Sequence, residues 1–368
     1  MVNKNIGIVS YNINCNFTNY GSALQSWALS ESIKKLGYRP VLIDYCPDIL
    51  KDKDPLDPMK NMWDTDEESR KLCELSLPAI RINYAKFEAF YSEKFNRTGK
   101  KYFSDSFNDV VNDENITGFV CGSDTIFCID EFGIDDGYYA NYPCMRGHSI
   151  SYAASFGDSH FDENSYKLLD SMLHNFKAIS IRESGFIPYI EERVSVPVKK
   201  VLDPTLLLEV QDFETIEAPQ IVKEPYILLY ARRYNSRMFD YADKLAKEFD
   251  CKVVDISLRA INADHHDMFY EAGVEEFLSL VHHAKFVVTN SFHGMIVSVH
   301  YRKPFVVFSR EQCDTKIDEV LELFGLSDRK LISGFESFAD IDYDKVHQNI
   351  ATARKDSIEF LSNGLNKL

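Results

Sequence analysis

IGIVSY at Ile6–Tyr11 and PVLIDY at Pro40–Tyr45 are short, apolar and rich in β-branched residues, which is typical of buried strands. Between them, residues 22–36 carry apolar side chains at helical spacing, and Gly37 provides a helix end. A strand, a helix and a second strand in this order predict a βαβ unit. Such a unit implies a parallel sheet covered by helices.

The same alternation of strand and helix patterns continues along the chain. Further strands are predicted at residues 116–121, 149–154, 178–181, 226–230, 252–256, 286–289 and 304–308. Helical patterns separate most of them, at residues 236–249, 274–283 and from 295 onward. We therefore expect two doubly wound, Rossmann-like α/β domains that face each other across a cleft.

The length of the chain also indicates two domains, because 368 residues exceed the size at which one hydrophobic core usually stops growing. The boundary is expected between residues 205 and 222, near several prolines. The predicted domains are residues 1–210 and 211–340. A helical pattern in residues 341–368 either packs back on the first domain or forms a dimer contact.

Charge and composition exclude several classes of partner. With 57 Asp and Glu against 41 Lys and Arg, the net charge is −16, which disfavours nucleic acid and anionic membrane surfaces. No apolar run has the length of a signal peptide or a bilayer span, so we expect a cytoplasmic protein. Eight cysteines lack the spacing of a zinc site, and neither His265-His266 nor His282-His283 has carboxylates placed to complete a metal shell. No metal is expected.

The loop after the strand at 286–289 is the best candidate for chemistry. Ser291, His293 and Gly294 lie where a strand turns into a helix, and the backbone N–H groups at such a turn attract anions. His293 adds a proton donor, and Gly294 lets a ligand approach the backbone. The alternative is that Ser291 only caps the helix and His293 bonds within the core.

Two cations near strand ends are candidates for holding an anionic donor. Arg182 ends the strand at 179–181, and Lys303 precedes the strand at 304–308. Arginine suits the bidentate grip of a carboxylate, whereas lysine is a compact charge suited to phosphate. Either residue is equally typical of an ordinary surface ion pair.

Loops after the first and third strands offer candidates for the acceptor side. Asn19, Tyr20 and Gly21 open the first helix, and Ser123 and Asp124 follow a buried strand, where they bind sugar hydroxyls or simply form a turn. Neither segment has the glycine spacing of a dinucleotide fingerprint or a P-loop, which disfavours nicotinamide and ATP enzymes.

Taken together and in this order, these segments resemble the polysaccharide pyruvyl transferase family over roughly residues 5–330. The matching segments are Asn19–Gly21 with Leu24-Gln25, Gly122–Asp124, Ser151–Gly157, Ser180–Glu183, Leu202–Leu207, and Thr289–Gly294 followed by Lys303-Pro304. The resemblance implies a fold similar to GT-B glycosyltransferases and phosphoenolpyruvate as donor. It also implies that Arg182, His293 and Lys303 hold the donor, with His293 as the catalytic acid. In this family arrangement, residues 1–210 would form the acceptor side and residues 211–340 the donor side.

The expected reaction transfers the enolpyruvyl group of phosphoenolpyruvate to a sugar of a bacterial surface polysaccharide or its lipid-linked precursor. A pyruvate ketal forms and phosphate leaves, with no cofactor besides the donor substrate. The chain departs from the family at Thr125–Phe127, where members often carry Gln and Trp. Two alternatives stay open: a GT-B glycosyltransferase with a nucleotide-sugar donor, and a non-catalytic carbohydrate-binding scaffold. The sequence leaves the oligomeric state open.

Overall fold

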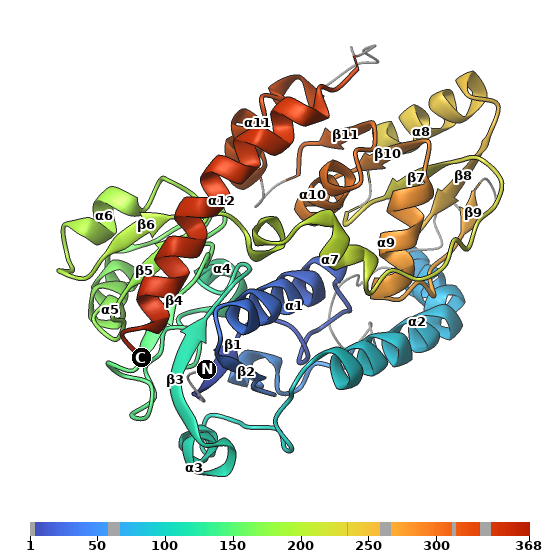
Figure 1. Cartoon of the computed structure of the whole chain (residues 1–368). Helices are drawn as coiled ribbons and strands as arrows, with labels where there is room; N and C mark the ends of the chain where they lie inside the picture. The colour runs from blue at the N-terminus through green and yellow to red at the C-terminus, as the bar shows by residue number, and fades with distance from the viewer. Residues whose placement is uncertain (1–3, 58–66, 234, 258–265, 311–313, 332–339) are drawn as a thin grey trace.

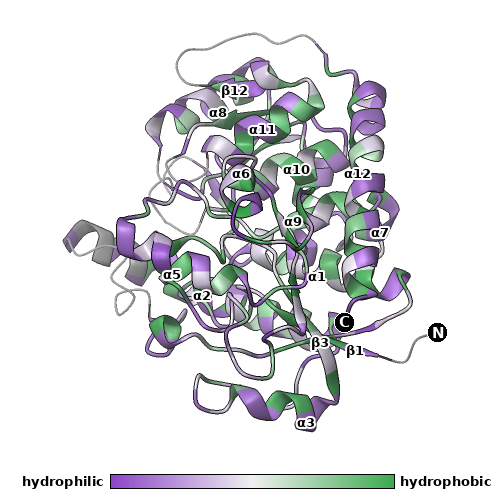
Figure 2. Ribbon diagram, turned by 90° about the vertical axis from the view of Figure 1, so that its left-hand side faces the viewer, coloured by the Kyte–Doolittle hydropathy of each residue, from purple (hydrophilic) through white to green (hydrophobic). Residues whose placement is uncertain are grey.

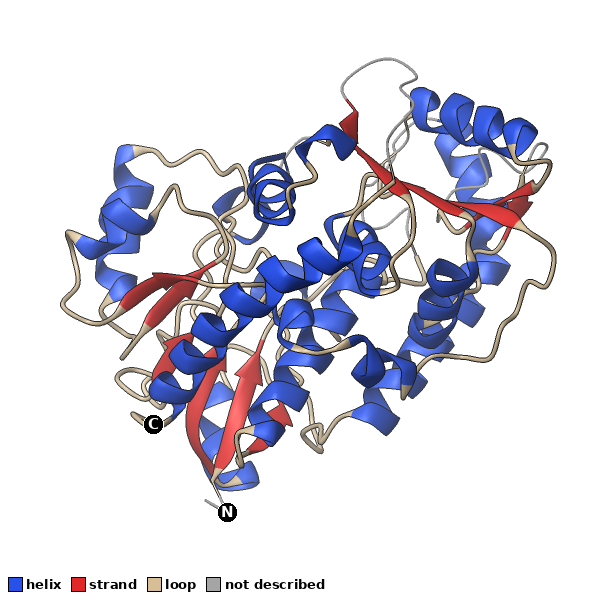
Figure 3. Ribbon diagram, turned by 45° about the horizontal axis from the view of Figure 1, so that its top comes forward, coloured by secondary structure: helices blue, strands red, loops and turns tan. Residues whose placement is uncertain are grey.

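The computed structural model describes residues 4–57, 67–233, 235–257, 266–310, 314–331 and 340–368. It contains two parallel sheets with helices between and around them (Figure 3). The strands of the first sheet, in the order β2-β1-β3-β4, are β2 (Arg39–Leu42), β1 (Asn5–Val9), β3 (Ile116–Cys121) and β4 (Ser149–Ser151). A separate parallel pair, β5 (Ile179–Ile181) and β6 (Val198–Lys200), touches this sheet through a bridge between Ala154 and Ile181.

The second sheet has six parallel strands in the order β12-β11-β10-β7-β8-β9. These are β12 (Lys330–Leu331), β11 (Phe305–Phe308), β10 (Phe286–Thr289), β7 (Tyr226–Tyr230), β8 (Lys252–Asp255) and β9 (Asp267–Met268). In β7, Ile227 and Leu229 pack on the side of α8 (Ser236–Glu248), whereas Leu228 and Tyr230 pack on the side of α9 (Val274–His283) and α10 (Phe292–His300). Helices on both faces explain why this strand is apolar without alternation.

The helix α1 (Tyr20–Lys35) lies between the first sheet and the second domain (Figure 1). It contacts α9, α10 and the 3-10 helix η3 (Pro204–Leu207), and most of its residues are buried. A helix buried on all sides needs no polar face, which fits its content of Ala, Ser, Leu and Trp. Its first turn therefore points at the junction between the two domains.

Two long helices join the domains. The helix α2 (Glu67–Lys94) lies against α9, where Lys86 pairs with Glu276 at 2.6 Å. A proline usually breaks a helical pattern, but Pro78 lies inside this helix. One proline removes a single backbone hydrogen bond, and tertiary packing of the buried part of the helix offsets that loss.

The helix α12 (Tyr343–Leu365) runs from the second domain to the first (Figure 1). Near its start Arg302 pairs with Asp344, and at its end Tyr38 donates to Asn366 at 2.9 Å. Figure 2 shows hydrophilic and hydrophobic residues mixed along α12, whereas α10 is mostly hydrophobic. This matches a helix with one packed face and a helix that is enclosed.

The remaining helices are shorter and connect these elements. They are α3 (Val110–Glu114), α4 (Ile129–Phe132), α5 (Glu163–Leu173), α6 (Ile187–Glu191), α7 (Val210–Glu214) and α11 (Asp314–Phe324), with 3-10 turns η1 (Asp48–Leu50), η2 (Phe107–Asp109) and η5 (Ser327–Arg329). Among the helices that the structure describes, none combines the length and hydrophobicity needed to span a bilayer.

Candidate active site

Arg182 stands at the carboxyl end of β5 and forms the centre of a buried ion network. Its Nη1 lies 2.6 Å from Asp203 Oδ2, and its Nη2 lies 3.3 Å from Asp124 Oδ1. The side chains of all three are at least nine-tenths buried. Burial alone would raise the pKa of Asp203, but the nearby positive charges of His293 and Arg182 hold that pKa well below its ordinary value. The carboxylate is therefore charged at neutral pH.

His293 brings the second domain into this network. It lies in the first turn of α10, and its Nε2 is 3.4 Å from Asp203 Oδ2. Its ring packs directly on Gly21 of α1, where an added Cβ would lie 2.1 Å from His293 Nδ1. Only glycine permits this approach, so Gly21 sets the distance between the two helix starts.

Asp124 is held by partners of its own domain. Its Oδ2 accepts a hydrogen bond from Ser22 Oγ at 2.5 Å, and its Oδ1 accepts from the amide of Thr125 at 3.0 Å. Its φ of 72° lies in the left-handed region, where Asp is tolerated better than most residues. Burial would raise the pKa of Asp124, but Arg182 and His293 lower it below the ordinary value. Asp124 and Asp203 thus share one arginine.

Lys316 is a site residue that the sequence did not reveal. It lies in the first turn of α11, is only 6% exposed, and its Nζ is 5.7 Å from the centre of the Phe292 ring. Arg182 Cζ is 5.2 Å from the centre of the same ring. A lysine within a helical pattern normally lies on the solvated face, so no sequence signal distinguishes this one.

Several buried polar atoms at this place have no hydrogen-bond partner in the described part of the chain. They are Arg182 Nε, Glu183 Oε2 and His293 Nε2. The other oxygen of Glu183 accepts from Ser155 Oγ, and burial raises the pKa of the Glu183 carboxyl. Native proteins leave few buried polar groups unpaired, so this concentration of them indicates a ligand site.

The start of α10 offers two further donors. Ser291 Oγ accepts from the amide of Gly294 at 3.2 Å, which is a standard helix cap. The amides of Phe292 and His293, at the first two helical positions, have no partner among the described residues. An added Cβ at Gly294 would lie 2.7 Å from Thr289 Oγ1, so glycine serves packing there rather than ligand approach.

Three predicted acceptor residues are engaged in the interior. Asn19 caps α1 and accepts from the amides of Gly21 and Ser22. Tyr20 donates its hydroxyl to the carbonyl of Ala272 at 2.8 Å, and Ser123 donates its hydroxyl to the carbonyl of Ala153 at 2.7 Å. These contacts hold the loops and the two domains in place. Of the five predicted acceptor residues, only Asp124 and Gly21 contact the Arg182 network.

The structure does not bring Lys303 to the network. Lys303 lies after the C-terminal end of α10, whereas His293 lies in the first turn of that helix. The helix is about 13 Å long, so it separates the two side chains. The carbonyl of Lys303 accepts from the Tyr343 hydroxyl, and burial lowers the pKa of the Lys303 ammonium while Glu217 opposes that change. Its position before a strand places it at the sheet edge opposite His293.

Both histidine pairs have carboxylates beside them, so the expectation that none is placed there is wrong. His282 Nδ1 lies 3.0 Å from both oxygens of Glu217, and with His283 these residues form a group with metal-ligand spacing. His266 lies between Asp243 and Asp255, whereas His265 falls outside the described residues. Glu217 lies in the linker between the domains, 65 residues before His282 in the sequence. No local sequence pattern could therefore predict this contact.

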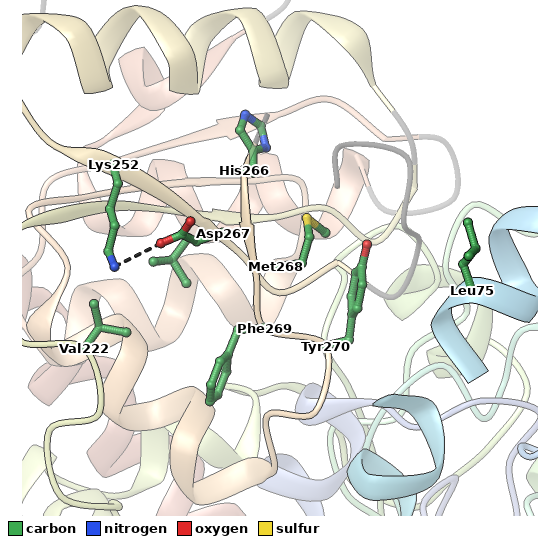
Figure 4. Close-up of a pocket in the computed structure, with 9 residues that line it drawn as sticks. Leu75, Val222, Lys252, His266, Asp267, Met268, Phe269 and Tyr270 are labelled. Carbon is green, nitrogen blue, oxygen red and sulfur yellow. Dashed lines mark ion pairs between the residues drawn. The ribbon is translucent and has the colours of Figure 1, made fainter. Parts of the chain in front are cut away.

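A pocket of about 700 Å³ lies elsewhere, at the β8–β9 edge of the second sheet (Figure 4). Its lining includes Val222, Phe269 and Tyr270 with an ion pair of Lys252 and Asp267 at 2.9 Å. No residue of the Arg182 network lines it. His266 Nδ1 and Tyr270 OH, both in its lining, are also buried without a hydrogen-bond partner in the described part of the chain. The Arg182 network remains the better candidate for chemistry, because it joins a buried arginine, two buried carboxylates and a histidine at the domain junction.

Two solved structures share the fold. A UDP-GlcNAc 2-epimerase from Methanocaldococcus jannaschii matches with a TM-score of 0.51 and 11% identity, covering 95% of this chain and 92% of that one. A protein described as a UDP-N-acetylglucosamine 2-epimerase from Listeria monocytogenes matches with a TM-score of 0.50 and 11% identity, covering 99% and 92%. These likenesses confirm the predicted fold class, a GT-B-like pair of α/β domains.

Sequence comparison identifies the family. No curated protein matches this chain. The family model described as polysaccharide pyruvyl transferase matches residues 19–312, a span that contains Gly21, Asp124, Arg182, Asp203 and His293. The chain belongs to the polysaccharide pyruvyl transferase family.

Proposed function

We propose that the protein transfers the enolpyruvyl unit of phosphoenolpyruvate to two hydroxyls of one sugar, forming a pyruvate ketal and releasing phosphate. Family membership supports the reaction class. The observation that carries the proposal is the contact of His293 with Asp203 inside a buried cationic network at the domain junction. That network combines an acid, a carboxylate that orients it and unpaired donors for an anion.

The reaction balances without an external reductant or oxidant. A proton adds to the methylene carbon of the enol, and one sugar hydroxyl bonds to the neighbouring carbon and gives up its proton. The carbon–oxygen bond to phosphate then breaks, and phosphate leaves with the electron pair. The second hydroxyl adds to the resulting cation and releases its proton. Two sugar O–H bonds, the carbon–oxygen bond to phosphate and the π bond of the enol are broken. Two ketal carbon–oxygen bonds and one methyl C–H bond form, and the remaining proton goes to the released phosphate, so no cofactor besides the donor is proposed.

His293 is the proposed acid for the first step. Its Nε2 faces the charged carboxylate of Asp203, which fixes the orientation of the ring. Gly21 on the opposite side of the ring prevents His293 from turning away, because the contact leaves no free space. The two domains together therefore hold one proton donor in place.

Arg182 has a different proposed role from the bidentate grip expected from sequence. Both of its terminal nitrogens already bind carboxylates, on Asp203 and Asp124, and only Nε is unpaired. We assign Arg182 to orienting Asp203 and Asp124, with Nε left for one hydrogen bond to the donor.

The proposed acceptor is a sugar of a bacterial surface polysaccharide or of its lipid-linked precursor. Because phosphoenolpyruvate is an intracellular metabolite, the proposal places the reaction in the cytoplasm, at the inner face of the membrane if the acceptor carries a lipid. Asp124 lies in the network with Ser22, and its loop departs from the family at Thr125–Phe127. We therefore assign acceptor choice to this loop.

The test is incubation with phosphoenolpyruvate and a panel of hexosides that carry adjacent or 4,6-related hydroxyl pairs. Released phosphate is measured, and the ketal is identified by the methyl resonance of the product. Phosphate release that depends on the acceptor, with a ketal of matching amount, supports the proposal. Thermal stabilisation by uridine or guanosine diphosphate but not by phosphoenolpyruvate would favour a nucleotide-sugar glycosyltransferase instead.

A further inference from the structure

The charge of Lys316 acts to lower the pKa values of the buried carboxyls of Asp124, Glu131 and Glu183, but Lys316 forms an ion pair with none of them. Lys316 is 6% exposed, and no hydrogen bond or ion pair joins its side chain to any described residue. Lysine is rarely buried unpaired, because removing an ammonium from water is costly unless something replaces the lost hydration. The ring of Phe292, with its centre 5.7 Å from Nζ, offsets only part of that cost.

The surroundings of Lys316 point to an anionic ligand. Both Lys316 Nζ and Arg182 Cζ lie near the ring of Phe292, at 5.7 Å and 5.2 Å from its centre. Two positively charged groups are therefore close to one side chain. Phe292 is the first residue of α10, and its amide and that of His293 are unpaired among the described residues. Free amides at a helix start attract negative charge, and the Lys316 ammonium lies 5.7 Å from the ring centre of the first of these residues.

Contacts across the domain junction fix the position of α11. Glu319 accepts from the amide of Ser184 at 3.0 Å and pairs with Lys200 at 2.5 Å, and Thr315 donates to Asp158 at 2.7 Å. Lys316 therefore sits on a helix that is anchored to the loop following Arg182. Burial raises the pKa of the neighbouring Glu183 carboxyl, although the charges of Arg182 and Lys316 oppose that change.

We propose that Lys316 and the amides of Phe292 and His293 form the subsite that binds the phosphate group of the donor. The inference rests on the proposed function for the identity of the donor, but the subsite itself requires only a phosphomonoester or phosphate. A compact ammonium beside helix amides suits a phosphate, whereas a carboxylate is gripped best by an arginine fork. As the ester bond breaks, charge grows on the phosphate, so the same ammonium stabilises the leaving group.

The experiment compares Lys316→Met and Lys316→Arg with the parent and with Lys345→Met, which removes an exposed lysine of α12. Calorimetry measures the binding of inorganic phosphate, phosphoenolpyruvate and pyruvate. We expect Lys316→Met to bind phosphate and phosphoenolpyruvate about 10-fold to 100-fold more weakly, as expected for loss of a charged hydrogen bond. Pyruvate binding is expected to stay unchanged in this variant, and Lys316→Arg and Lys345→Met should stay close to the parent.

The melting temperature separates a binding role from a structural one. Without ligand, Lys316→Met should melt close to the parent temperature, because no hydrogen bond or ion pair in the described part of the chain is lost and methionine fills a similar volume. A large fall in melting temperature, with parent-like phosphate binding by Lys316→Met, would overturn the inference. Loss of pyruvate binding with retained phosphate binding would also overturn it, since Lys316 would then hold the carboxylate.

The same variants distinguish a failure of the phosphate subsite from a failure of the proposed reaction. A parent that binds inorganic phosphate through Lys316 but forms no ketal from phosphoenolpyruvate supports the subsite and contradicts the proposed reaction. A parent that forms the ketal at a rate unaffected by Lys316→Met supports the reaction and contradicts the subsite. A parent that binds no phosphate contradicts the subsite directly.

Discussion

Asp203 Oδ2 lies 3.4 Å from His293 Nε2, and this contact joins a residue before η3 in the first domain to the start of α10 in the second. The same oxygen is 2.6 Å from Arg182 Nη1. One carboxylate thus orients the proposed acid and neutralises the central arginine. Changes at Asp203 are expected to affect catalysis and stability together.

Asp203→Asn is expected to lower kcat by about 100-fold or more, because the proposed acid loses the carboxylate that orients it. Removing one partner of a buried ion pair should also destabilise the fold by about 3–5 kcal/mol. Phosphate release and urea unfolding measure the two effects. Asp105→Asn, at an exposed aspartate, is the matched control. Parent-like activity in Asp203→Asn would remove this carboxylate from the mechanism.

The dependence of folding stability on pH in the acid range tests separately whether the network lowers the pKa of Asp203. Its pKa is lower in the folded protein than the ordinary 3.8, so its contribution is fully present above that value. The contribution is lost as pH falls below about 4 and toward the folded value. The parent should therefore lose stability over this range more steeply than Asp203→Asn, as followed by circular dichroism during acid titration. Equal slopes would show that the network does not shift this carboxyl.

Gly21→Ala tests the contact between the two helix starts. The added Cβ would lie 2.1 Å from His293 Nδ1, so the ring or the whole second domain must move. We expect a loss of kcat of about 100-fold, as is typical of misplacement by about 1 Å, despite the better helix propensity of alanine. Gly99→Ala, where the new Cβ meets nothing within 4 Å, should leave activity and melting temperature unchanged. A fully active Gly21→Ala variant would contradict the proposed position of His293.

Glu183→Gln tests the buried carboxyl beside Arg182. Burial raises the pKa of Glu183 above the ordinary 4.5, so the folded state holds this proton more tightly than the unfolded state does. Stability from this group is then largest at low pH and falls as pH rises from about 4.5 through the folded value. At pH 7 the glutamine variant should be at least as stable as the parent, in contrast to Asp203→Asn. Urea unfolding at pH 5 and pH 7 measures this, with Glu191→Gln as an exposed control.

The parts of the site that the sequence could predict are those at strand ends. Asp124 and Arg182 follow β3 and β5, and His293 follows β10, so one rule about parallel sheets placed all three near the domain junction. Lys303 precedes its strand, and the same rule puts it at the opposite edge. Lys316 depends on how α11 docks across the junction, which no local spacing encodes.

For the fold, too, local sequence patterns predict individual elements but not the contacts between distant ones. The unit of β1, α1 and β2 followed from periodicity, because buried parallel strands and an enclosed helix leave strong local patterns. The continuation of α2 through Pro78 did not follow, since packing on α9 decides whether a proline is tolerated. The approach of Glu217 to His282 likewise results from the path of the linker between domains.

The group of Glu217, His282 and His283 leads to a last prediction, which concerns metal dependence. His283 Nδ1 lies 2.9 Å from the carbonyl of Ser279 and must donate to it, so this nitrogen is not free to bind a cation. Lys303 adds a positive charge near Glu217, which further disfavours a metal. We therefore expect preincubation with a chelator to leave phosphate release unchanged, and Glu217→Gln to alter stability more than kcat. Loss of activity with the chelator, restored by zinc or manganese and abolished in Glu217→Gln, would instead establish a metal at the connection between the domains.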